Sequence, residues 1–129
     1  MERGPVVPIV AGFFYRAPPQ SELARYRSIA LAASQRAAAE AARSNAETST
    51  LDDLAGIAVP TLIVQGRHDR TRTPQHGAHM CALLPDARLA VIENAGHTPQ
   101  LEQPEEFYAA TLPFLLHVRL GGGRSTEVS

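Results

Sequence analysis

The 129-residue sequence has little of what marks several classes of protein. Its single cysteine, Cys81, excludes an internal disulfide, so nothing indicates an oxidising compartment. A net charge of −1 gives no electrostatic reason to expect nucleic acid or an anionic membrane as a partner. No apolar run approaches the roughly 20 residues of a membrane span. Pro5, Pro8 and Gly12 break the apolar start that a secretory signal peptide needs. We therefore expect a cytoplasmic protein that binds neither nucleic acid nor a membrane.

What is present suits one modest globular core. Hydrophobic residues make up 44% of the chain and charged residues 19%, which are ordinary values. We divide the chain into a helical segment (residues 1–50), an α/β core (51–120) and a flexible tail (121–129) with the sequence GGGRSTEVS. Within the first segment, the alanine-rich residues 19–46 predict one helix.

The core alternates strands and helices. Residues 57–66, IAVPTLIVQG, form an apolar, β-branched run ending in glycine, which is typical of a strand buried on both faces. Residues 88–94, RLAVIEN, predict a second strand. Helices are expected over 73–84, where a threonine cap precedes a first-turn proline, and over 104–118. Strands joined by a helical crossover are almost always parallel, so the fold class is α/β with two parallel strands.

Two strands are too few for an independent sheet. Parallel strands this apolar need neighbouring strands and helices on both faces. We expect the N-terminal apolar cluster, a second copy of the chain or a different chain to complete the sheet. The sequence therefore predicts that the chain does not act as a lone monomer.

Two residues with catalytic potential follow the strands. Asp69 comes after the first strand in VQGRHD, and His97 comes after the second in IENAGH. The exit loops of adjacent parallel strands lie together, and working residues of open α/β sheets sit there. A carboxylate that accepts from one imidazole nitrogen leaves the other free as a general base. Gly66 and Gly96 fit the tight turns that such loops need.

Residues 54–116 resemble the carboxyl-terminal part of the α/β-hydrolase fold. The resemblance rests on VPTL, then G and D, then LPDARLAVIENAGH, then EQPEEF and FLL. It is strongest to the branch with enol-lactonases, carbon–carbon bond hydrolases of meta-cleavage products, esterases and haloperoxidase-like members. It implies that Asp69 is the triad acid and His97 the triad base, that residues 19–50 are what remains of a helical cap, and that no cofactor is needed.

The sequence departs from that family where the nucleophile is expected. The fold carries its nucleophile earlier in the chain, on a G-x-S-x-G elbow, and neither that motif nor an HGG-type oxyanion loop occurs here. Our first hypothesis is therefore a hydrolase of an ester, lactone or carbon–carbon bond in a small-molecule substrate, with its nucleophile supplied from elsewhere. The alternatives are a non-catalytic truncated hydrolase that dimerises or binds a ligand, and a fragment of a full-length hydrolase.

Other polar residues have simpler interpretations. His76 and His79, with His68 and Asp69 nearby, are expected to lie on a solvated surface rather than to bind a metal. Cys81 is expected to be a buried structural thiol, and Glu102 to orient its loop or stabilise a helix start. The remaining expectations are solvated loop arginines (Arg67, Arg70, Arg72) and aromatic core residues (Phe13, Phe14, Tyr15).

Overall fold

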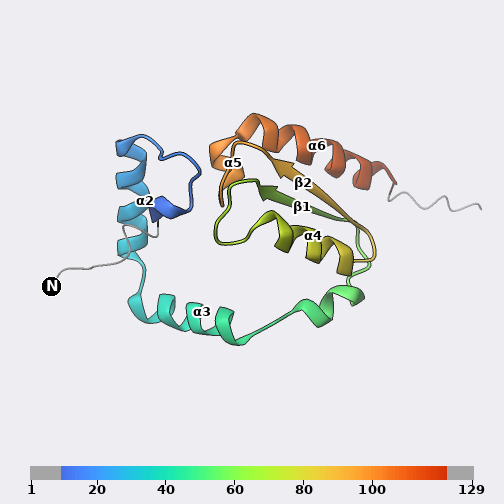
Figure 1. Cartoon of the computed structure of the whole chain (residues 1–129), viewed down its shortest axis with the longest axis horizontal. Helices are drawn as coiled ribbons and strands as arrows, with labels where there is room; N and C mark the ends of the chain where they lie inside the picture. The colour runs from blue at the N-terminus through green and yellow to red at the C-terminus, as the bar shows by residue number, and fades with distance from the viewer. Residues whose placement is uncertain (1–9, 122–129) are drawn as a thin grey trace, which may run out of the picture.

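The computed structural model describes residues 10–121 (Figure 1). The expected flexible tail thus lies outside the described residues, apart from Gly121, as does the start of the chain. The elements in chain order are α2 (Gln20–Ala32), α3 (Gln35–Glu47), the 3-10 helix η1 (Leu51–Gly56), β1 (Thr61–Gly66), α4 (Pro74–Leu83), β2 (Ala87–Ile92), α5 (Pro99–Glu102) and α6 (Pro104–Gly121). No helix among these is long and apolar enough to cross a membrane.

The two predicted strands form a parallel pair. Thr61 lies opposite Ala87 at the start and Gly66 opposite Ile92 at the end, and within the described residues the sheet has two strands. The predicted α/β class is therefore confirmed. The first strand is shorter than expected: it begins at Thr61 and not at residue 57, because Pro60 has no N–H to give to a ladder.

One helix covers each face of the sheet. Side chains alternate along β1, so that Leu62 and Val64 face α6 while Ile63 and Gln65 face α4. The α4 side is tightly packed: a Cβ on Gly77 would lie 3.0 Å from the Gln65 side-chain oxygen. The parallel pairing brings the ends of both strands, and the loops that follow them, to one end of the sheet, on the side of α2 (Figure 1).

The expected single helix over residues 19–46 is wrong: two helices occupy this stretch. Ala33 is extended, and Ser34 caps α3 by accepting a hydrogen bond from the Ala37 N–H at 3.3 Å. The first N–H groups of a helix have no carbonyl partner within it, and a serine side chain can accept a hydrogen bond from one of them. A new helix can therefore begin directly after Ser34. Every residue of α3 is exposed, and in α2 only Leu23 is buried.

The exit loops of the two strands are joined through their backbones. Arg67 N–H donates to the Ile92 carbonyl and His68 N–H to the Ala95 carbonyl, each at 2.9 Å. A Cβ on Gly66 would lie 1.9 Å from the carbonyl oxygen of Gly96. The described glycines all have negative φ, so close backbone approach, and not a left-handed turn, requires glycine at residue 66.

The loop after β2 also holds a helix that the sequence interpretation missed. This helix, α5, occupies Pro99–Glu102, between the predicted strand at residues 88–94 and the predicted helix at 104–118. Pro99 stands at its first position, where a missing N–H costs nothing. This turn of helix fixes the loop that carries His97.

Replacing Gly66 by alanine tests the close approach of the two loops. The added methyl group would overlap backbone atoms that cannot rotate away, so we expect Gly66→Ala to lower the free energy of unfolding by about 3 kcal/mol. Gly56→Ala is the matched control, because a Cβ there meets nothing within 4 Å. Urea unfolding of the three proteins makes the comparison; equal effects of the two substitutions would refute the tight junction.

Candidate active site

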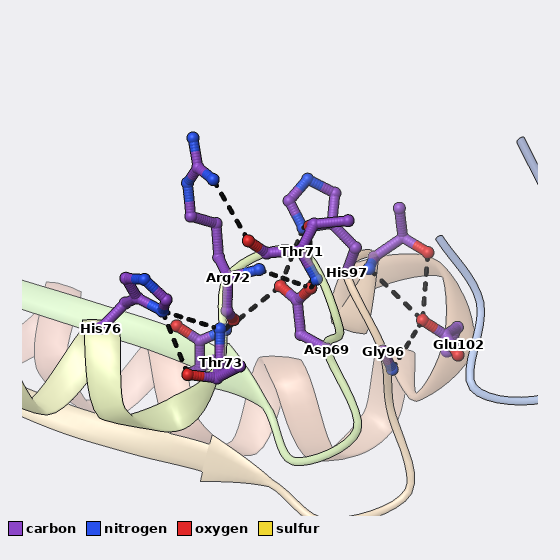
Figure 2. Close-up of polar contacts among 10 residues, drawn as sticks. Asp69, Thr71, Arg72, Thr73, His76, Gly96, His97 and Glu102 are labelled. Carbon is purple, nitrogen blue, oxygen red and sulfur yellow. Dashed lines mark hydrogen bonds and ion pairs between the residues drawn. The ribbon is translucent and has the colours of Figure 1, made fainter. Parts of the chain in front are cut away.

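The Asp69 carboxylate is the most densely hydrogen-bonded group of the described structure. Its side chain is 3% exposed. Oδ1 accepts from the Thr71 N–H at 2.8 Å, the Thr71 hydroxyl at 2.9 Å and the Arg72 N–H at 2.9 Å (Figure 2). Oδ2 accepts from Gln65 Nε2 at 3.2 Å and from His97 Nδ1 at 2.8 Å. The loop RHDRTR thus folds around its own aspartate.

These contacts set the charge of Asp69. Burial raises the pKa of the carboxyl group, but hydrogen bonds from the Arg72 backbone, His97 and Thr71 outweigh it and lower the pKa to about 2. Gln65 is buried too, and its amide also donates to the Arg72 carbonyl. Asp69 is therefore an ionised carboxylate at neutral pH, and all five groups that contact it are donors.

The hydrogen bonds assign the tautomer of His97. Because ionised Asp69 can only accept, the proton in the 2.8 Å contact between Asp69 Oδ2 and His97 Nδ1 belongs to Nδ1. Thr71 fits the same assignment: its single hydroxyl proton goes to Asp69, so its oxygen, 2.9 Å from Nδ1, accepts a share of the Nδ1 proton in a bifurcated hydrogen bond. Nε2 then carries a lone pair, and no residue of 10–121 forms a hydrogen bond with it.

The pair lies beside an open pocket of about 290 Å³. The His97 side chain is 38% exposed, in contrast to its buried partner. The lining combines the end of β1, the Asp69 loop, α4 and the His97 loop, with Gln65, Gly66, Asp69, Arg72, His76, Met80, His97 and Pro99 among its residues. None of the residues lining this pocket is a serine or cysteine. The arrangement can take up and release a proton at Nε2, but it offers no nucleophile.

A second carboxylate holds the backbone of the His97 loop. Glu102 Oε1 accepts from the Gly96 N–H at 2.9 Å and from the Thr98 N–H at 3.3 Å and hydroxyl at 3.1 Å, on either side of His97 (Figure 2). The sequence had suggested that Glu102 orients its loop, and these bonds confirm it. Glu102 Oε2 accepts from the Tyr15 N–H at 2.7 Å, a contact that the sequence did not predict.

The other candidate residues have structural contacts. His76 Nδ1 accepts from the Thr73 N–H at 3.1 Å and so caps α4. Arg67 is not simply solvated: it forms a two-pronged ion pair with Glu93 at 2.6 and 3.0 Å. Cys81 is half-buried where a buried thiol was expected. In the part of the chain that the structure describes, no three His, Cys, Asp or Glu side chains gather as metal ligands would.

Three further contacts of the site were missed by sequence reasoning. Gln65 had a signal, because a glutamine next to the end of an otherwise apolar strand needs a buried partner. Thr71 had a weaker one, as an acceptor and donor two residues after Asp69. Phe13, whose ring lies 5.1 Å from that of His97, had none: the residues are distant in sequence.

The lowered pKa of Asp69 predicts a pH-dependent stability. A carboxyl group with a depressed folded-state pKa stabilises the fold above its unfolded pKa, near 3.9, and loses that contribution as the pH falls toward 2. We expect Asp69→Asn to be less stable than wild type by on the order of 2 kcal/mol at pH 6. Urea unfolding at pH 6, 4 and 2 should show this difference shrinking; a constant difference would contradict the assigned ionisation.

Comparison with known proteins agrees with the sequence resemblance. Residues 2–110 match the model of the alpha/beta hydrolase family. A 2-hydroxy-6-oxononadienedioate/2-hydroxy-6-oxononatrienedioate hydrolase from Pseudomonas putida is 44% identical over 64 residues, which are 50% of this chain and 22% of that protein. Among solved structures, a hydrolase from Pseudomonas aeruginosa PA01 superposes with a TM-score of 0.75 at 28% identity, over 85% of this chain and 42% of the other.

A further structure supports the fold alone. An esterase from Exiguobacterium antarcticum, 24% identical, superposes with a TM-score of 0.79 over 88% of this chain and 41% of its own. This chain thus spans between about a fifth and two fifths of the length of the proteins compared here. The two parallel strands and their helices are part of an α/β-hydrolase fold, and the chain belongs to the alpha/beta hydrolase family.

Proposed function

We propose that Asp69 and His97 are the acid and base of a hydrolase active site. One observation carries the proposal: ionised Asp69 holds Nδ1–H of His97 at 2.8 Å, so that the basic Nε2 is left to face a reacting group. In this mechanism Nε2 takes the proton of an attacking hydroxyl group and later gives it to the leaving group. Asp69 stabilises the imidazolium that forms between the two transfers.

We propose a small molecule with an ester, lactone or activated carbon–carbon bond as the substrate. The similar proteins are by name hydrolases of 2-hydroxy-6-oxo dienoates and esterases, which supports this range. All these reactions need a base that activates a nucleophile, and in our proposal Nε2 of His97 is that base. The chemistry at Asp69 and His97 asks for no cofactor.

The nucleophile comes from elsewhere in this proposal. No G-x-S-x-G motif occurs in the sequence, and no serine or cysteine lines the pocket beside His97. Two features support docking of a partner there: β1 pairs with β2 along one edge, and an apolar groove of about 510 Å³ lies between β1 and α6. Its lining is Leu62, Val64, Phe107, Tyr108, Thr111, Leu112, Phe114 and Leu115.

A segment of different sequence fits this role better than a second copy of the same residues. A copy related by a two-fold axis normal to the sheet would pair along β1 in the antiparallel direction. Its exit loops would then lie at the opposite end of the sheet from His97. Such a copy can complete the sheet but brings nothing to Nε2, whereas a partner with a parallel strand brings its own exit loop to the same edge.

Complementation tests the proposal. We would co-express this chain with the Pseudomonas putida hydrolase from which the 64 matched residues have been deleted, and assay cleavage of 2-hydroxy-6-oxononadienedioate. We expect activity that neither part has alone. His97→Gln should lower kcat by about 10²–10⁴-fold, the usual contribution of a general acid–base group. His117→Gln is the matched control, because His117 lies exposed on α6.

Co-purification through a tag on one part separates docking from chemistry. If the two parts do not associate, a covalent fusion of them is assayed in the same way. A complex or fusion whose activity is the same with His97→Gln as with His97 would overturn the proposed role.

A further inference from the structure

An aromatic segment far from His97 in sequence lies against it. Phe13, Phe14 and Tyr15 are half-buried, and each ring has a different neighbour. The Phe13 ring centroid lies 5.1 Å from that of His97, and Tyr15 stacks on His68 at 3.6 Å, in the exit loop of β1. Phe14 stacks on Tyr26 of α2 at 5.6 Å. The three residues thus join both exit loops to α2.

Two backbone contacts hold this aromatic segment (residues 13–15) in place. The His97 N–H donates to the Phe13 carbonyl at 2.7 Å. The Tyr15 N–H donates to Glu102 Oε2 at 2.7 Å, while Glu102 Oε1 holds the Gly96 and Thr98 N–H groups. The backbones are close: a Cβ on Gly96 would lie 2.7 Å from the Phe13 carbonyl oxygen. Glu102 is therefore a clamp between the aromatic segment and the His97 loop.

We propose that Glu102 is a positioning residue for His97: it fastens the aromatic segment to the His97 loop, so that the Phe13 ring forms a fixed wall against the imidazole. The inference rests on the proposed function of His97 as a base. Asp69 holds only Nδ1, and the His97 side chain is 38% exposed. A wall on one face of the ring restricts its rotation and keeps water from that face.

The chemistry of the clamp makes Glu102→Gln a selective change. All four groups that contact Glu102 are donors, and a carboxylate has two acceptor oxygens for them. Glutamine keeps one acceptor oxygen and replaces the other by a donor. Its oxygen can satisfy the three groups of the His97 loop, while its NH₂ group would then face the Tyr15 N–H. We expect the variant to keep the loop and release the aromatic segment.

Amide hydrogen exchange measured by NMR on the whole chain tests this division. Glu102→Gln should raise the exchange rate at Tyr15 and His97 at least tenfold and leave Gly96 and Thr98 within about threefold of wild type. Glu102→Ala should raise all four. Glu106→Gln is the matched control, because it removes an exposed carboxylate from the first turn of α6 and should change none of them.

The imidazole itself supplies the second measurement. Phe13→Ala and Phe13→Leu keep the backbone bonds to His97 but remove the aromatic ring current, so the His97 ring protons should shift relative to wild type. Glu102→Gln should move them in the same direction. Unchanged His97 ring shifts in Glu102→Gln, or equal exchange rates at Tyr15 and Thr98, would overturn the inference.

These readouts need no turnover, so they separate this inference from the proposed function. In the complemented enzyme, Glu102→Gln should lower kcat more than it changes KM for 2-hydroxy-6-oxononadienedioate. If His97→Gln has no effect on activity while the NMR results stand as expected, the proposed function fails and the clamp is structural, which would overturn its positioning role.

Discussion

The hydrogen bond between Asp69 and His97 is the constraint on which the rest of the site depends. A buried carboxylate is costly unless donors surround it, and here five donors do. Four of them come from the chain between Gln65 and Arg72, so the exit loop of β1 is folded around the charge. The fifth comes from the exit loop of β2, so the same charge orients the imidazole. The charge of Asp69, the shape of the β1 exit loop and the tautomer of His97 are therefore coupled, so that a change in one alters the others.

The sequence predicted the parts of this arrangement that follow from local patterns. Two apolar runs and a proline-started helix indicated parallel strands, and parallel strands place their exit loops together, which brought Asp69 and His97 into contact as expected. Whether they catalyse a reaction stays a prediction. The sequence analysis missed the break at Ser34. Whether this serine continues one helix or caps a new one depends on a small free-energy difference that composition does not show. The sequence analysis also missed Phe13 against His97, since that contact depends on how distant segments pack.

The same packing explains where the molecule is open. The core is small: its buried apolar residues within 10–121 are Val10, Leu23, Leu54, Leu84, Ile92 and Ala95. The sheet is covered on both faces, yet the groove along α6 leaves Tyr108, Leu112 and Leu115 more than half exposed. Apolar surface of this kind beside a strand edge marks a place for association. We propose that one partner segment, docked on this surface, adds strands to the sheet and supplies the nucleophile.

The central claim is that Asp69 holds His97 with its proton on Nδ1. The direct measurement is the ¹⁵N spectrum of the neutral His97 ring. The account predicts a protonated Nδ1, whose proton resonates far downfield and exchanges slowly, and an unprotonated Nε2; Asp69→Asn should abolish the downfield signal. A His97 ring protonated at Nε2 in the wild-type chain would contradict the account, because the nitrogen proposed as the base would then carry the proton.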